Sequence, residues 1–153
     1  MSEENQQFAI QKIYLKDVSF ESPNSPQVFT GGDVQPQISV QINSSNRTIA
    51  DDTYEVVLDL TVTATHEEKT AFLAEVKQAG VFTISGFPQE NIGGMVGAFC
   101  PETLFPYARE AISELVAKGG FSQLLLAPVN FNALYTQQVQ QQEAAQTEEE
   151  TAH

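Results

Sequence analysis

The sequence is poor in the residues that build disulfides, cysteine metal sites and nucleic-acid interfaces. Cys100 is the only cysteine among 153 residues, so neither an internal disulfide nor a cysteine-based zinc site can form. Seven Lys and Arg residues stand against twenty Asp and Glu residues, which gives a formal net charge of -13. Because clustered cations bind phosphate backbones, this shortage predicts that nucleic acid is not a ligand. An acidic surface can instead steer a basic partner toward itself.

Long apolar runs are also missing. No segment approaches the roughly 20 apolar residues that span a bilayer, so we expect no direct membrane insertion. The first residues, 1–7, are polar and acidic, without the basic and apolar parts of a signal peptide. Together with the single cysteine, these absences predict a soluble cytoplasmic protein in a reducing compartment.

Four segments alternate between apolar and polar residues, as strands with one covered face do. They are 8–20, 34–43, 54–65 and 71–84. Turn-forming residues between them, including the stretch 43–46, predict short connections and therefore antiparallel pairing. In the first segment, the side chains predicted to share the more apolar face are Ile10, Tyr14, Val18 and Phe20.

The period changes to that of helices in the second half. Apolar residues recur at helical spacing from Pro101 to Lys118, and two glycines then end the pattern. After a loop, Asn130 is predicted to cap a second helix that runs to about Gln142. The glycine-rich stretch 91–98 remains unassigned.

These elements predict the fold class α+β: a four-stranded antiparallel sheet followed by a long helix, a connecting loop and a C-terminal helix. A single domain over residues 8–142 is expected, because a chain of this length forms one core. The polar ends, 1–7 and the acidic tail 143–153, are expected to be disordered.

Side chains capable of catalysis are few and poorly grouped. His153 ends the chain, and His66 stands in a charged turn where a solvated side chain is the simpler interpretation. Cys100 precedes a predicted helix whose dipole could stabilise a thiolate, but its apolar neighbours favour a buried structural thiol. An acid–base enzyme using Asp51 or Asp52 is the alternative, although a turn does not fix the necessary geometry. We therefore expect no enzyme activity, no metal site and no cofactor.

Two strands carry acidic side chains at even spacing. Asp17 and Glu21 project from one face of the first strand, and Leu73 and Glu75 share one face of the fourth. If the two faces coincide, the sheet presents carboxylates around an exposed leucine. The alternative is a solvated sheet face without a partner.

The loop after the long helix carries much apolar surface. Its side chains could pack onto the sheet, or they could form a groove that accepts apolar side chains from another chain. They are Phe121, Leu124, Leu125, Leu126, Val129 and Phe131. One sheet and two helices also leave apolar faces uncovered, which predicts oligomerisation.

Several stretches closely resemble the SecB family of protein-export chaperones. They are FCP at 99–101, LFPYARE at 104–110 and LAPVNF at 126–131, together with IY at 13–14, KD at 16–17, SFE at 19–21, ADD at 50–52 and YEVVL at 54–58. The resemblance extends from about residue 8 to about residue 142. It implies a homotetramer, a dimer of dimers with its helices between two outer sheets.

The resemblance implies an ATP-independent chaperone that binds unfolded precursor polypeptides, keeps them translocation-competent and delivers them to the translocation ATPase SecA. The alternative is a general or antitoxin-linked holdase on the same scaffold without SecA coupling. Family roles would place SecA binding at Asp17, Glu21, Leu73 and Glu75. The client groove would lie between the sheet and the loop that joins the helices, with candidates Val34, Val40, Phe121, Leu124, Leu126 and Phe131.

The sequence departs from the family pattern at two positions. Val34 occupies a position where tryptophan is frequent, and we expect the loss of a large aromatic ring to alter one groove wall. Ala74 replaces a common cysteine, so that thiol is not required for assembly.

Overall fold

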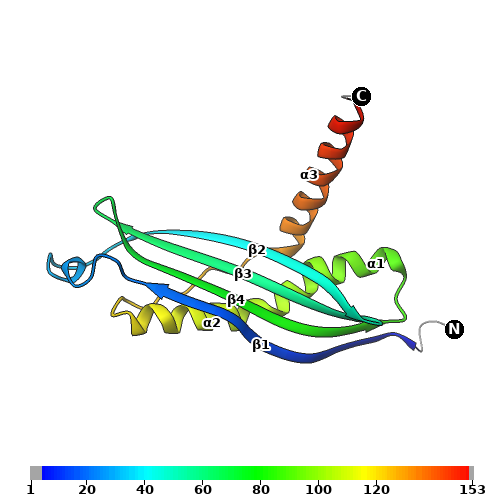
Figure 1. Ribbon diagram of the computed structural model, residues 1–153, viewed down its shortest axis with the longest axis horizontal. Coiled ribbons are helices and arrows are strands. Elements are labelled where there is room, and N and C mark those ends of the chain that lie inside the picture. Colours follow the sequence, from blue (N-terminus) through cyan, green and yellow to red (C-terminus); the bar gives the residue numbers. More distant parts are fainter. Residues whose placement is uncertain (1–4, 152–153) are drawn as a thin grey trace.

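The computed structural model describes residues 5–151 and is built on a four-stranded antiparallel sheet (Figure 1). The strand order is β1-β4-β3-β2, so β1 and β2 form the two edges. Tight turns with positive φ connect the strands of two hairpins: Asp52 lies in the turn between β2 and β3, and Glu67 and Glu68 lie in the turn between β3 and β4. The predicted fold class and antiparallel pairing are confirmed. The strands are β1 (Gln7–Glu21), β2 (Gln37–Ala50), β3 (Thr53–His66) and β4 (Lys69–Ser85).

The second strand differs from its prediction at both ends. It begins at Gln37 rather than at residue 34, in keeping with the missing N–H of Pro36. It continues through 43–46, so the predicted turn there is wrong: Asn43 lies opposite Asp59 in β3. Because β2 is an edge strand with a solvated face, its polar side chains need no buried partner.

The chain between β1 and β2 passes from one edge of the sheet to the other. This segment, 22–36, includes the short 3-10 helix η2 (Gln27–Phe29). The Asn24 side chain donates a hydrogen bond of 2.8 Å to the Thr70 carbonyl, which ties the segment to the start of β4.

Helices follow the sheet in one continuous run. α1 (Gln89–Gly94) leads through a π-helical turn, η3 (Met95–Phe99), into α2 (Cys100–Lys118), which assigns the glycine-rich stretch that the sequence left open. α2 agrees with its prediction, and Pro101 occupies its first turn. Gly120 follows with a φ of 90°, a conformation that glycine adopts without a steric cost.

The last helix, α3 (Phe131–Thr151), begins as predicted but is longer. The Asn130 side chain accepts a hydrogen bond of 3.0 Å from the backbone N–H of Ala133, as a cap does. The helix continues past Gln142, where a disordered tail was expected from residue 143. Gln, Glu and Ala are good helix formers and neither glycine nor proline follows, so nothing in the sequence ends the helix. Residues 1–4 and 152–153 of the predicted disordered ends lie outside the described residues.

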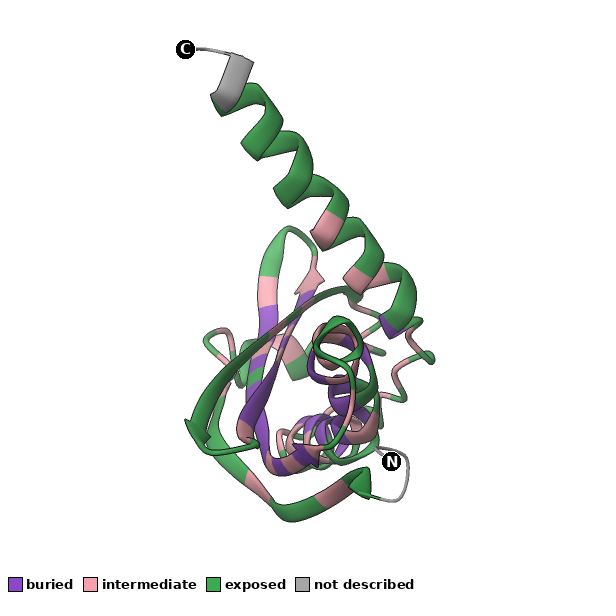
Figure 2. Cartoon of the chain, turned by 90° about the vertical axis from the view of Figure 1, so that its right-hand side faces the viewer, coloured by how far each residue is buried: buried purple, intermediate pink, exposed green. Residues whose placement is uncertain are grey.

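The core lies between the sheet and α2. Figures 1 and 2 show α1 and α2 lying across one face of the sheet, with the buried residues in the layer between, while α3 projects away and is mostly exposed. As predicted, the apolar residues of β3 and β4 alternate into this layer. Residues with an exposed fraction of 1% or less include Leu58, Leu60, Phe72 and Phe82 from the sheet and Leu104, Ile112 and Val116 from α2. No helix among the described residues is long and apolar enough to cross a membrane.

Candidate functional site

The outer face of the sheet, turned away from the helices, carries the predicted acidic residues. Glu21 in β1 lies opposite Leu73 in β4, and Ser19 lies opposite Glu75. Directly opposite residues of an antiparallel pair project to the same side. Asp17 lies two residues before Ser19, so it shares that side. The two predicted faces therefore coincide, and we call Asp17, Glu21, Leu73 and Glu75 the acidic patch.

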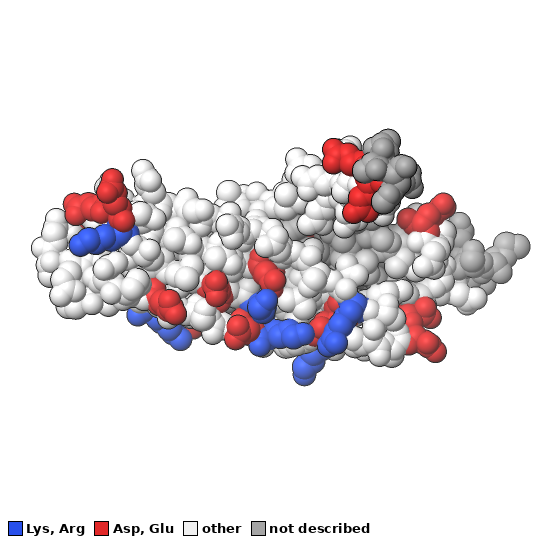
Figure 3. Space-filling view, turned by 45° about the horizontal axis from the view of Figure 1, so that its top comes forward, with Lys and Arg blue, Asp and Glu red and all other residues white. Residues whose placement is uncertain are grey.

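The carboxylates of the acidic patch are available to a partner. Asp17, Glu21 and Glu75 are exposed, and none of them forms an ion pair within the part of the chain that the structure describes. Beside them, the Lys77 ammonium lies 3.4 Å from Asp59. Figure 3 shows acidic and basic side chains interspersed along one border of the molecule.

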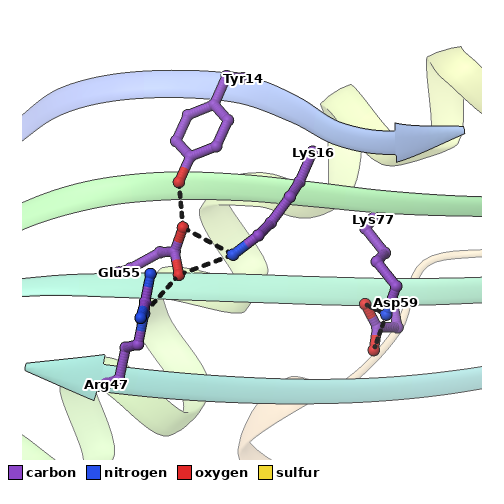
Figure 4. Close-up of polar contacts among 6 residues, drawn as sticks. All are labelled: Tyr14, Lys16, Arg47, Glu55, Asp59 and Lys77. Carbon is purple, nitrogen blue, oxygen red and sulfur yellow. Dashed lines mark hydrogen bonds and ion pairs between the residues drawn. The ribbon is translucent and has the colours of Figure 1, made fainter.

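A second charge cluster lies on the outer face around Glu55 (Figure 4). Glu55 in β3 accepts a hydrogen bond from the Tyr14 hydroxyl, two bonds from the Lys16 ammonium at 3.0 and 3.1 Å, and one from Nε of Arg47 at 2.9 Å. The Tyr14 bond is the main cause that lowers the pKa of the Glu55 carboxyl to about 2, with Lys16 next. Burial, followed by the bond to Glu55, raises the pKa of Tyr14 to about 12.

This cluster corrects one prediction about β1. Tyr14 was predicted to share the apolar face with Ile10, Val18 and Phe20, but its hydroxyl reaches Glu55 on the opposite face. Register shifts between Ile10 and Lys12 and between Leu15 and Asp17 break the two-residue alternation along the strand. Even spacing therefore gives the wrong face for Tyr14 and the right one for Asp17 and Glu21, which both follow the second shift.

An aromatic groove opens at the far end of α2. The ring of Phe121 lies 4.9 Å from that of Phe72 and 5.1 Å from that of Phe29, between ring centroids. Phe72 is fully buried, whereas Phe29 keeps 41% of its surface exposed. The cavity beside them measures about 310 Å³. Its lining residues are Phe29, Gly32, Asp33, Val34, Pro36, Ile38, Phe72, Val116, Gly120, Phe121, Ser122, Gln123 and Leu124.

The structure divides the predicted groove residues into two groups. Val34, Phe121 and Leu124 line the aromatic groove, but Val40, Leu126 and Phe131 do not. Phe131 is buried beneath the start of α3, where its ring lies 5.6 Å from that of Phe105. Phe29 and Phe72 were missed, because nothing local in the sequence shows that their segments meet the loop after α2.

Apolar surface continues from the groove along the inner face of β2. Ile38 and Val40 lie opposite the buried Ala64 and Val62 of β3, so they point to the helix side of the sheet. α2 packs on β3 and β4 and leaves β2 uncovered, so these two side chains stay 39% and 40% exposed. Leu126, which packs partly against the core, belongs to the loop that follows the groove.

The other candidates for chemistry do not form a site. The described residues contain no group of three or more His, Cys, Asp or Glu side chains placed to hold a metal ion. Cys100 is fully buried, and that burial raises the pKa of its thiol to about 12. His66, the last residue of β3, lies 4.0 Å from Glu67 in the turn that follows, whereas Cys100 is the first residue of α2.

Comparison with known proteins shows the family to which the chain belongs. Residues 1–142 match the family model described as preprotein translocase subunit SecB. The chain belongs to the SecB family. Curated SecB relatives named protein-export protein SecB support this: that of Methylococcus capsulatus is 57% identical over 92% of each chain. That of Nitrosococcus oceani is 54% identical over 94% of this chain and 90% of its own.

SecB membership establishes the function in outline. The chain is a protein-export chaperone, and the family implies binding of unfolded precursors and of export machinery. The SecB fold recurs in a solved structure, the SecB-like chaperone of Mycobacterium tuberculosis in complex with a ChAD peptide from the HigA1 antitoxin. That chain is 14% identical with a TM-score of 0.65, and the match covers 80% of this chain and 90% of the other. At this identity the likeness concerns the fold alone.

Proposed function

We propose that this chain holds unfolded precursors in the aromatic groove without ATP and passes them to SecA at the acidic patch. The groove supports the first part, because it combines the exposed ring of Phe29 and the half-buried ring of Phe121 with an uncovered apolar strand face. Extended, non-native chains expose the alternating apolar side chains that such a surface accepts. A holdase of this kind withdraws the unfolded state from aggregation by mass action.

The acidic patch supports the second part of the proposal. Glu21 lies directly opposite the half-buried Leu73, and Glu75 follows two residues later in β4. These two carboxylates and Asp17 are exposed and form no ion pair among the described residues, an arrangement that suits a basic partner with an apolar contact. The Lys-rich, zinc-bearing C-terminal tail of SecA has that character. Separate surfaces would let the chain hold a client and dock on SecA at the same time.

Assembly into a cytoplasmic homotetramer completes the proposal. On β1, Ile10, Leu15 and Val18 remain 39–51% exposed, and in the loop after α2 Leu125 remains 73% exposed. Burial of these side chains between copies would remove them from water. A dimer of dimers has four copies of 16.8 kDa, and light scattering should therefore give a mass of 67.2 kDa.

The test of SecA docking removes two charges from the acidic patch without changing side-chain shape. We expect Asp17→Asn with Glu75→Gln to weaken SecA binding roughly tenfold or more in calorimetry, while suppression of precursor aggregation without ATP is unchanged. Glu67→Gln with Glu68→Gln removes the same charge from an exposed turn and serves as the control. Equal SecA affinity in the two double variants would reject docking at the acidic patch.

A further inference from the structure

β1 contains an extra residue at the point where it enters the acidic patch. Leu15 lies opposite Gln78 and Asp17 lies opposite Lys77, so two successive residues of β4 face three of β1. Lys16 is the additional residue, which makes this shift a β-bulge. Its side chain reaches the outer face, as the contact with Glu55 shows, and Asp17 follows on the same face.

The bulge decides which face of the sheet receives the carboxylates. A shift of one residue moves every later side chain of a strand to the opposite face. Without the extra residue, Val18 and Phe20 would take the outer face and Asp17 and Glu21 would turn toward the helices. With it, Phe20 stacks on Phe72 with ring centroids 5.7 Å apart.

The Glu55 cluster holds the extra residue of the bulge, Lys16, and Tyr14, which lies two residues before it. Figure 4 shows Tyr14 and Lys16 reaching across β4 to Glu55 in β3, and Arg47 approaching Glu55 from β2. Ala79, the β4 residue opposite Tyr14, is small enough to leave that path open. Glu55 is 6% exposed and is the only buried carboxylate of the described residues. A buried carboxylate with three donors keeps those donors in place, since leaving it unpaired is costly.

We propose that Glu55 acts through Lys16 and Tyr14 as a positioning residue, fixing the bulge and thereby the outward direction of Asp17 and Glu21. The inference rests on the proposed docking of a basic partner at the acidic patch. Neither Glu55 nor Lys16 is required to touch that partner. The cluster instead connects the central strand β3 to an edge strand whose end would otherwise be free to change register.

Replacement of Lys16 by methionine distinguishes positioning from simple charge. The substitution removes a cation beside the acidic patch, so long-range electrostatics alone predict tighter binding of a basic partner. Positioning by Glu55 predicts the opposite. The Kd of Lys16→Met for SecA should rise about fivefold, which is the lower end of the affinity changes found for coupling between distinct sites. Lys12→Met is the matched control, since Lys12 lies on the same face opposite Val81 and has no ion pair with Glu55. We expect Kd for Lys12→Met to be unchanged or lower.

A conservative variant and a measurement without SecA complete the test. Lys16→Arg keeps a charged donor for Glu55, so it should retain wild-type affinity. Amide hydrogen exchange should accelerate over residues 17–21 in Lys16→Met and not in Lys12→Met. Wild-type exchange, or an affinity of Lys16→Met equal to that of Lys12→Met, would overturn the positioning role.

Two further outcomes keep this inference separate from the proposed function. If Asp17→Asn with Glu75→Gln leaves SecA binding intact, docking at the acidic patch fails, whereas the exchange measurement still decides whether Glu55 fixes the bulge. If Lys16→Met also loses client holding, Tyr14→Phe takes its place, because it removes only one hydroxyl from the cluster. Faster exchange over residues 17–21 in Tyr14→Phe supports the role, and unchanged exchange contradicts it.

Discussion

Replacement of Glu55 by glutamine should remove one defined part of the acid sensitivity of this protein. The folded-state pKa of Glu55 is lowered to about 2 from an ordinary value of 4.5. A lowered pKa means that the ionised form stabilises the fold. That contribution is fully present above about pH 4.5 and is lost as the pH falls toward about 2.

The contacts of Glu55 also set the size of its contribution to the free energy of unfolding. The full shift corresponds to a ceiling of about 3.4 kcal/mol, at about 1.36 kcal/mol per pKa unit. Water screens the two cations, because the side chains of Lys16 and Arg47 are 42% and 69% exposed. We therefore expect a contribution of about 1.5 kcal/mol at neutral pH. A glutamine at this position keeps the shape of the side chain but cannot carry the charge.

The assay is denaturant unfolding of both proteins at matched concentration, from about pH 6 to about pH 3. At the upper end the wild type should be more stable by about 1.5 kcal/mol, and the difference should shrink as the pH falls. Comparing two proteins at each pH removes the contributions of all other carboxylates. A difference that stays constant with pH would refute the idea that Tyr14, Lys16 and Arg47 hold Glu55 in its ionised form.

Two other substitutions test the groove and the attachment of the last helix. Phe29→Ser should weaken precursor binding by up to about tenfold with little loss of stability, since the ring is 41% exposed. Ile49→Ser, at 45% exposure and outside the groove, is the control in the same aggregation assay, and equal suppression by both would argue against the groove. Gly97→Ala should destabilise the fold by about 1–3 kcal/mol, because a Cβ there would lie 2.4 Å from the Tyr135 ring of α3. Gly94→Ala meets no atom within 4 Å in a helical backbone and should keep or raise the melting temperature; a matching loss in both would refute the contact argument.

The sequence predicted the sheet well wherever burial enforces strict alternation. In β3 and β4 every second residue enters the core, so period and face could both be inferred. On the edge strands that constraint is weaker, and the errors of face or extent fall there: the face of Tyr14 in β1 and the two ends of β2, including the stretch 43–46. A β-bulge has no local signature in the sequence, because any residue can occupy it.

The candidate site was predicted only in part, because some of its contacts join segments that are distant in the sequence. The acidic patch depends on residue spacing within β1 after the bulge and within β4, which the sequence contains, and on the pairing of the two strands, which it does not. The aromatic groove depends on three distant segments meeting at Phe29, Phe72 and Phe121, and only the last was identified. The length of α3 was underestimated because a polar, charged composition was taken to indicate disorder, although its residues favour a helix.

The burial of Cys100 has a consequence for the covalent chemistry of a chaperone complex. A thiolate on the chaperone could attack a disulfide of a bound client, displacing one client thiolate and leaving a mixed disulfide between the two chains. The only sulfhydryl of this chain is fully buried and has a pKa of about 12, so it supplies almost no thiolate at neutral pH. A bound client therefore meets no reactive sulfur, and its release leaves no mixed disulfide to be reduced.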